Sequence, residues 1–195
     1  MARPREFDET VVVAAARERF HETGYAATSL DDLTKATGLG KGSLYGAFGD
    51  KRHLFQRALD DYCAAATEAI AQALRGPDDG ALARLQAYAT GVANDSSARD
   101  RRGCLLANTT VELAGRDAEA AAVALSTYEA LEAEIAACVA QAQRHGDVPG
   151  QSDPHDLAAV FTATMRGVEV LGKAGTARRK LRTIADAAVH ALTVG

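Results

Sequence analysis

Residues 28–55 constrain the fold of this 195-residue chain more than any other stretch. Thr28 or Ser29 stands at an N-cap position before an apolar helical repeat, and an aspartate three residues later completes a capping box. Gly38 can end this helix, because glycine readily adopts the left-handed backbone of a helix C-cap. A second short helix is predicted over about residues 41–48. The pattern indicates two short helices joined by a tight turn.

The second predicted helix has an apolar face and a polar face. Leu44 and Phe48 are four residues apart, so they would be buried side by side. The residues left facing outward are Lys41, Gly42, Ser43, Tyr45 and Gly46. A short helix pair with a glycine-containing turn, whose second helix exposes cationic, hydroxyl and aromatic side chains, is typical of a DNA-binding helix-turn-helix.

DNA recognition needs phosphate contacts for positioning and base contacts for discrimination. Thr28, at the start of the first short helix, would offer its hydroxyl and free backbone amides to a phosphate. Lys41 can reach a guanine or a phosphate, Gly42 permits close approach to the groove floor, and Ser43 can bond to either. Tyr45 can lie against the DNA backbone or a thymine methyl group. These residues form the predicted DNA-binding face.

The same stretch resembles the N-terminal domain of TetR-family transcriptional regulators. The segment GLGKGSLYGAFGDK, residues 38–51, is similar to the family's recognition helix and the entry to its fourth helix, and the close match covers about residues 8–57. The resemblance implies an all-α fold of about nine helices. It further implies a three-helix DNA-binding domain over 1–50 and a helical ligand-binding and dimerisation domain over 51–195. It also implies a phosphate contact at Lys51, with Arg52 beside it.

Composition supports a helical protein and excludes several other classes. Apolar residues make up 47% of the chain and aromatic residues 5%, which indicates an interior rich in the strong helix formers alanine and leucine. No apolar run approaches the roughly 20 residues of a membrane span, and the N-terminus lacks a signal core. Cys63, Cys104 and Cys138 fit neither a disulfide framework nor a zinc site, so a cytoplasmic location without metal or cofactor is expected.

Charge is distributed unevenly along the chain. The net charge is −4, but it divides into +1 for residues 1–57 and −5 for the remainder. The basic groups of the first part cluster at Arg3, Arg5, Lys41, Lys51 and Arg52. A small cationic face suffices for a module that contacts a few phosphates, and the acidic remainder would be repelled by DNA and so help to orient it.

A single helix-turn-helix makes few DNA contacts, so a second copy of the chain is the expected partner. Two such heads about 34 Å apart would read successive major grooves of a palindromic site. Helices predicted at about 154–173 and 176–193 are the candidates for pairing. Their apolar stripes contain Phe161, Met165 and Val168 on the first and Leu181, Ile184, Ala188 and Leu192 on the second. The same stripes could instead fill the core of one chain.

A small-molecule pocket is expected among the helices between residues 81 and 173, where the polar segment 94–103 is predicted to be a loop. Its candidate lining combines apolar walls with a few hydroxyl groups. These residues are Tyr88, Leu105, Leu106, Thr109, Leu113, Tyr128, Leu131 and Met165. Each of them could equally be an ordinary core residue.

Cys104 is a candidate sensor thiol. It follows Arg101, Arg102 and Gly103 at the predicted start of a helix over about 105–113. Nearby guanidinium groups and a helix N-terminus both favour the reactive thiolate. The Gly-Cys-Leu sequence also resembles a subset of TetR-like repressors that sense electrophiles or oxidants through a thiol. The alternative is an inert, buried cysteine.

The sequence therefore predicts a DNA-binding transcriptional regulator. Repression is the family default, with release from a palindromic operator by a small molecule or a thiol-reactive inducer. One alternative is a helical interaction or ligand-binding protein whose DNA-binding head is vestigial. An enzyme is a further alternative, but the five histidines are dispersed and no glycine-rich phosphate loop follows a strand, so catalysis is not expected.

Overall fold

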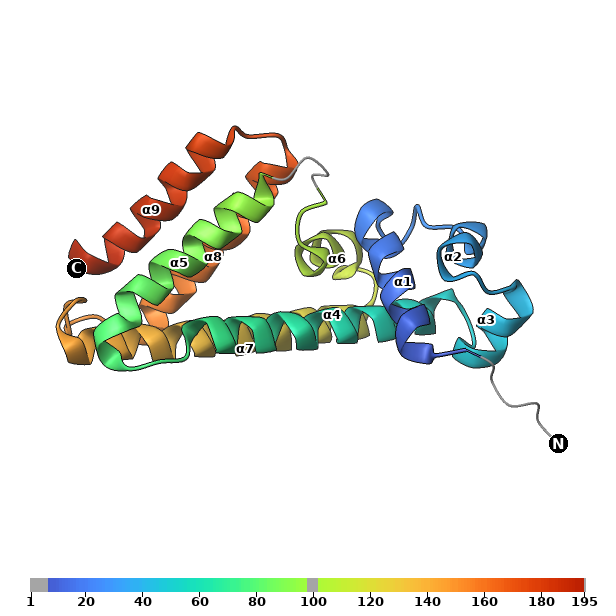
Figure 1. The fold of residues 1–195 in the computed structure, drawn as a ribbon, viewed down its shortest axis with the longest axis horizontal. Helices are drawn as coiled ribbons and strands as arrows, with labels where there is room; N and C mark the ends of the chain where they lie inside the picture. The colour runs from blue at the N-terminus through green and yellow to red at the C-terminus, as the bar shows by residue number, and fades with distance from the viewer. Residues whose placement is uncertain (1–6, 98–101, 195) are drawn as a thin grey trace.

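The computed structural model describes residues 7–97 and 102–194 (Figure 1). Its helices are α1 (Glu9–Thr23), α2 (Leu30–Thr37), α3 (Lys41–Phe48), α4 (Lys51–Leu74), α5 (Ala81–Ser96), α6 (Leu105–Leu113), α7 (Ala118–His145), α8 (Pro154–Lys173) and α9 (Arg178–Val194), with a 3-10 turn at Asp78–Gly80. The prediction of an all-α fold with about nine helices is confirmed, because these two segments contain no strand. None of the helices in them is both long and apolar enough to span a bilayer. Arg3, Arg5 and Arg101 lie outside the described residues.

Local capping residues define helices α1 to α3, which we call the head. Ser29 is the N-cap of α2: its hydroxyl accepts a hydrogen bond from the amide of Asp32, whose carboxylate accepts one from the amide of Ser29. Gly38 ends α2 with a left-handed φ of 71°. Leu44 and Phe48 of α3 are buried as predicted, which turns the other side of that helix toward solvent.

Helix α4 connects the head to the remaining helices, which we call the body (Figure 1). Its first turns belong to the core of the head, since the ring of Phe55 meets the ring of Phe20 edge-to-face at a centroid distance of 5.0 Å. Its later turns bury Ile70 and Leu74 in the body. One continuous helix is therefore part of both hydrophobic cores.

In the body, α4 and α7 lie side by side, and α5, α8 and α9 pack together above them (Figure 1). Helices α5 and α8 approach so closely at Gly172 that a Cβ there would overlap the backbone oxygen of Ser96. Helix α5 includes Ser96, so the loop predicted from residue 94 begins too early. Ala93 and Ser96 are both buried, and burial of this face extends the helix past its polar residues.

The apolar stripes that were predicted to pair two copies form part of the hydrophobic core of a single chain. Phe161, Met165 and Val168 are at most 1% exposed and lie in the chain's own core, as do Leu181 and Leu192 at 4% or less. Ile184 and Ala188 are partly buried against the same core. The prediction that these stripes face a partner is therefore wrong, because their side chains are already covered within one chain. The exposed faces of α8 and α9 carry other apolar residues, namely Val160, Val170, Leu171 and Val194.

Candidate nucleic-acid interface and regulatory cavity

The outer side of α3 is an open face. Lys41, Gly42, Ser43, Tyr45 and Gly46 are all exposed, as the sequence predicted. No atom lies within 4 Å of a Cβ placed on either glycine, so the face is free of covering groups. Tyr45 retains 47% of its accessible surface. This face can approach a DNA groove without rearrangement of the chain.

Lys41 has a local partner across the turn. Its ammonium lies 2.8 Å from the carboxylate of Asp31, and both side chains are exposed. The hydrogen bond from Lys41 lowers the pKa of Asp31 and raises that of Lys41. A phosphate that binds Lys41 would replace the carboxylate of Asp31 as its partner. The free-energy cost of this exchange is small, because exposed ion pairs are weak.

Thr28 is placed differently from the prediction. Its side chain is only 1% exposed, and its hydroxyl donates to the carbonyl oxygen of Gly24 at 2.6 Å. The hydroxyl of Thr23 lies 2.7 Å from the same oxygen atom of Thr28. The threonine hydroxyl therefore holds the turn before α2 and is not presented to a phosphate. Ser29 takes the exposed N-cap position instead.

The two basic residues at the start of α4 have different surroundings. The ammonium of Lys51 lies 4.4 Å from the ring centroid of Tyr25, and partial burial lowers its pKa. Arg52 forms two hydrogen bonds of 3.0 Å with Asp117 and one of 2.8 Å with Glu119. Arg52, which was also predicted to contact DNA, thus ties α4 to the start of α7.

Helix α6 and the segment before it contact the head directly. Glu112, near the end of α6, accepts hydrogen bonds from the amides of Tyr25 at 3.0 Å and Ala26 at 2.6 Å. At the other end of α6, a ring nitrogen of His21 lies 2.7 Å from the carbonyl oxygen of Gly103. We call these contacts, together with the Arg52 bridge, the head–body joint. The sequence does not reveal them, because each joins residues far apart in the chain.

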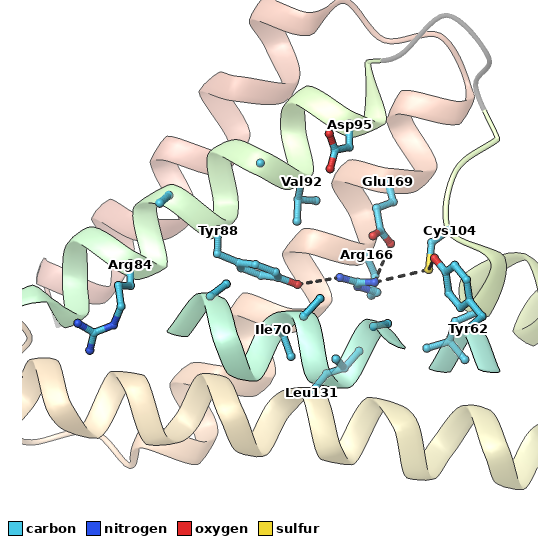
Figure 2. A pocket seen from close by; sticks show the side chains of 16 residues that line it. Tyr62, Ile70, Arg84, Tyr88, Val92, Asp95, Cys104, Leu131, Arg166 and Glu169 are labelled. Atoms are coloured by element: carbon cyan, nitrogen blue, oxygen red, sulfur yellow. Dashed lines mark hydrogen bonds and ion pairs between the residues drawn. The ribbon is translucent and has the colours of Figure 1, made fainter. Parts of the chain in front are cut away.

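A cavity of about 440 Å³ lies in the body, among α4, α5, α6, α7 and α8 (Figure 2). Of the predicted lining residues, Tyr88, Leu106 and Leu131 line it, together with Cys104. The other predicted residues do not line it: Leu105, Thr109 and Met165 are buried, and Leu113 and Tyr128 are partly buried against the core. The remaining walls are mostly small, contributed by Ala66, Ala69, Ala73, Ala87 and Gly91.

A polar cluster that the sequence did not predict crosses this cavity (Figure 2). Arg166 donates to the hydroxyl of Tyr88 at 3.1 Å and to the sulfur of Cys104 at 3.7 Å. Its guanidinium also lies 2.9 Å from Glu169, one turn further along α8. Tyr62 donates to the same sulfur at 3.5 Å. In the sequence, this cluster is visible only as two opposite charges on the apolar helix α8. The side chains of Arg166 and Glu169 are only 18% and 15% exposed.

The environment of Cys104 corrects the predicted origin of its reactivity. Cys104 is the N-cap of α6, as expected, but its side chain is buried. Arg102 forms an ion pair with Glu18 at 2.6 Å, which directs that guanidinium to the head. Burial raises the pKa of the Cys104 thiol, and Glu169 raises it further, while Arg166 and Tyr62 lower it. The structure therefore holds Cys104 mainly as a thiol.

A second cavity, of about 480 Å³, separates the head from the body. The residues Thr23 and Gly24 line it on the head side, and Lys173 does so on the body side. Cys104 and Glu169 line this cavity as well as the one inside the body. These two residues form part of the wall between the cavities. Among residues 7–97 and 102–194, no cluster of three histidine, cysteine or acidic side chains could hold a metal ion.

Comparison with known proteins places both parts of the chain. A family profile of bacterial regulatory proteins of the tetR family matches residues 12–58, and a profile of the tetracyclin repressor-like C-terminal domain matches residues 81–189. The chain is 28% identical over 184 residues to the HTH-type transcriptional repressor ComR of Escherichia coli strain K12, a match that covers 94% of this chain and 88% of ComR.

Solved structures give the same result for the whole fold. The TetR family transcriptional regulator CifR, as a cysteine mutant complexed with 26-base-pair double-strand operator DNA, is similar with a TM-score of 0.75 and 26% identity, over 97% of this chain and 99% of that one. A regulatory protein TetR from Rhodobacter sphaeroides has the same fold, with a TM-score of 0.83 and 24% identity over 93% of this chain and 97% of that one. The chain belongs to the TetR family of bacterial DNA-binding transcriptional regulators.

Proposed function

We propose that this protein is a repressor that binds a palindromic operator as a dimer and leaves it when a compound enters the body cavity. The open face of α3 is the observation that carries the proposal, because it presents Lys41, Ser43 and Tyr45 around two glycines with nothing covering them. ComR is described as a repressor, and CifR was solved with operator DNA, which supports the same activity here. Since its ligand is operator DNA, the protein would act in the bacterial cytoplasm.

The second copy would pack on the exposed faces of α8 and α9. Val160, Gly167 and Val170 lie on one face of α8, and Val194 lies on α9, with alanines between them. Val160, Val170 and Val194 are each more than half exposed in the single chain. Exposed apolar side chains favour association, and small residues allow helices to approach closely.

Val160→Arg should therefore separate the dimer and weaken operator binding by about a hundredfold or more, since one head alone loses half of the phosphate and base contacts. Sedimentation velocity at micromolar concentration and titration of a palindromic duplex would measure both effects. Leu125→Arg is the matched control, because Leu125 is 61% exposed against 67% for Val160 but lies on α7. A wild-type monomer with full operator affinity would contradict the proposal.

Lys51 is proposed as a phosphate contact at the edge of the α3 face. Lys51→Ala should weaken binding to all DNA sequences alike and reduce the salt slope by about 0.9 per contact, or about 1.8 in a dimer. Ser43→Ala should instead change base preference, by about 1–3 kcal/mol per discriminating contact. Arg75→Ala, at the opposite end of α4, is the control for loss of one cation. An unchanged salt slope in Lys51→Ala would remove this assignment.

The inducer is proposed to act at the body cavity, through Cys104 in particular. The thiol lines the cavity and begins α6, and Glu112 near the end of that helix binds the amides of the head. An adduct on the sulfur would add bulk to the cavity at the start of α6, and we expect it to move α6 and loosen the head–body joint. Such a compound acts as an inducer only if it favours the state that cannot bind DNA. The Gly-Cys-Leu sequence around this thiol is the proposed mark of the electrophile-sensing subset.

A further inference from the structure

In the cluster around Cys104, one cation faces two groups that can become negatively charged, the carboxyl group of Glu169 and the thiol of Cys104. Arg166 is the cation, and it contacts both the carboxylate of Glu169 at 2.9 Å and the sulfur of Cys104 at 3.7 Å (Figure 2). Both contacts use the same guanidinium nitrogen, Nη1. The carboxylate and a thiolate would therefore compete for one stabilising group. This competition has a functional consequence only because, under the proposed function, Cys104 is the thiol that the inducer modifies.

Glu169 has few other partners that could stabilise its charge. Its oxygen Oε2 is buried and has no hydrogen-bond partner beyond the ion pair, and Nε of Arg166 is buried and unpaired as well. Burial raises the pKa of Glu169, while Arg166 and a hydrogen bond with Cys104 lower it. The carboxylate thus depends on Arg166 for its ionised form. The other ionisable groups around the two cavities are Glu22 from α1, Tyr62 from α4, Arg84, Tyr88 and Asp95 from α5, Glu112 from α6, Tyr128 from α7 and Lys173 from α8.

We propose that Glu169 keeps Cys104 in its protonated, unreactive form by holding Arg166, and that this charge balance makes the thiol accept uncharged electrophiles in preference to anionic ones. Two negative charges beside one guanidinium leave one of them uncompensated in a buried site, which is unfavourable. The thiol keeps its proton as long as Glu169 is ionised. Glu169 is thus a positioning residue that acts on the sulfur through Arg166.

The preference for uncharged reagents follows from the same charge count. With Glu169 ionised, the cation is already neutralised, so a transient thiolate gives the cluster a net charge of −1. An anionic electrophile would bring a second negative charge into the apolar cavity. An uncharged reagent of the same size, such as an amide or an imide, meets no such repulsion.

Alkylation by iodoacetamide measures the reactivity directly. The thiol releases its proton to water, the sulfur forms a bond to the methylene carbon, and iodide leaves with the electrons of the carbon–iodine bond. Iodoacetate follows the same course with a negative charge in place of the amide. The ratio of the two rate constants at Cys104, followed by peptide mass spectrometry on the intact dimer, therefore reports the charge of the site separately from access to it.

Glu169→Gln should increase the rate of Cys104 alkylation by iodoacetamide by about threefold to tenfold at pH 7.5. A decrease of about one unit in thiol pKa gives about ten times more thiolate, and the lower intrinsic nucleophilicity removes part of that gain. The midpoint of the pH–rate curve should move to lower pH. Iodoacetate should gain more than iodoacetamide, because Arg166 is then uncompensated. Glu129→Gln, on the exposed face of α7, is the control for loss of a carboxylate and should change neither rate.

A double variant, Arg166→Gln with Glu169→Gln, keeps the test decisive if the single variant does not fold, because it leaves no lone charge buried. Its Cys104 should react within about threefold of wild type and show no gain for iodoacetate. A rate at least tenfold below wild type would mean that Arg166 already activates the thiol, and the proposal would be overturned. A folded Glu169→Gln that reacts no faster than wild type, with an unchanged reagent ratio, would also overturn it.

These kinetic measurements contain no DNA, so they fail independently of the proposed function. If Cys104 shows the expected charge dependence but its modification leaves operator binding intact, the inference about Glu169 stands and the sensor role is lost. If modification releases the operator but the reagent ratio is insensitive to Glu169, the sensor role stands and this inference is lost.

Discussion

Cys104→Ser should abolish the release of operator DNA by N-ethylmaleimide. In the wild-type dimer we expect modification to weaken operator affinity by about 5–150-fold, the usual range of coupling between two sites. The serine variant keeps a small polar side chain at the N-cap of α6, so its affinity before treatment should match wild type. It lacks the nucleophile, and its affinity should therefore be unchanged after treatment. Fluorescence anisotropy of a labelled palindromic duplex would measure all four affinities.

Cys63→Ser and Cys138→Ser are the natural controls for this experiment. Both thiols are buried on other helices, and neither lines the two cavities through which a reagent can reach Cys104. These variants should respond to N-ethylmaleimide as wild type does, and mass spectrometry should find Cys104 labelled first. If Cys104→Ser still releases DNA, the thiol is not the sensor. The cavity would then be better interpreted as a site for reversible binding of a small, largely apolar ligand.

The head was predictable because its determinants are local. Ser29, Gly38 and Leu44 act through neighbours within a few residues, as caps or as one apolar face. Such patterns survive without knowledge of the tertiary structure, so the sequence places α2 and α3 correctly. Prediction from neighbouring residues failed for side chains that can bond to several partners. The hydroxyl of Thr28 bonds within the turn, and Arg52 reaches Asp117, 65 positions away.

The cavity was predicted only in outline, since its walls come from five helices. Tyr88, Leu106 and Leu131 were anticipated, but Arg166 and Glu169 were not. A buried ion pair is visible in sequence only as two charges on an apolar helix, which is also the pattern of a solvated edge. Small residues such as Gly91 create the space, and no periodicity distinguishes a residue that lines a cavity from one that fills a core. The same ambiguity misassigned the stripe of Phe161, which is covered within one chain.

The head–body joint determines how a change in the cavity can reach the DNA. Two routes are available: α4, which belongs to both cores, and α6, which starts at Cys104 and carries Glu112 near its other end. Arg52 holds the first route against α7, and Glu112 holds the second against the turn before α2. A tilt of either helix would change the separation of the two heads in a dimer. The α6 route begins at the thiol itself, and α4 contacts the thiol through the hydrogen bond from Tyr62.

Glu112→Ala should uncouple the thiol from the DNA-binding head. The variant removes both hydrogen bonds that α6 makes to the amides of Tyr25 and Ala26, so a shift of α6 no longer pulls on the turn between α1 and α2. We expect Cys104 to react with N-ethylmaleimide at the wild-type rate. The ratio of operator affinities before and after modification should fall from about 5–150-fold to within about twofold of unity. Labelling kinetics and anisotropy titrations on the same samples would separate chemistry from transmission.

The control for this variant is Glu129→Ala, which removes an equal charge from an exposed position on α7 and should leave the coupling intact. The ratio of operator affinities in Glu112→Gln should lie between those of wild type and Glu112→Ala, because the single amide oxygen of glutamine can accept only one of the two hydrogen bonds well. A wild-type ratio in Glu112→Ala would show that the signal travels through another contact of the head–body joint, either along α4 or through His21 and Gly103 beside the thiol. If α4 carries it, the Arg52 bridge to Asp117 is the coupling element, and Arg52→Ala should reduce the ratio that Glu112→Ala left unchanged.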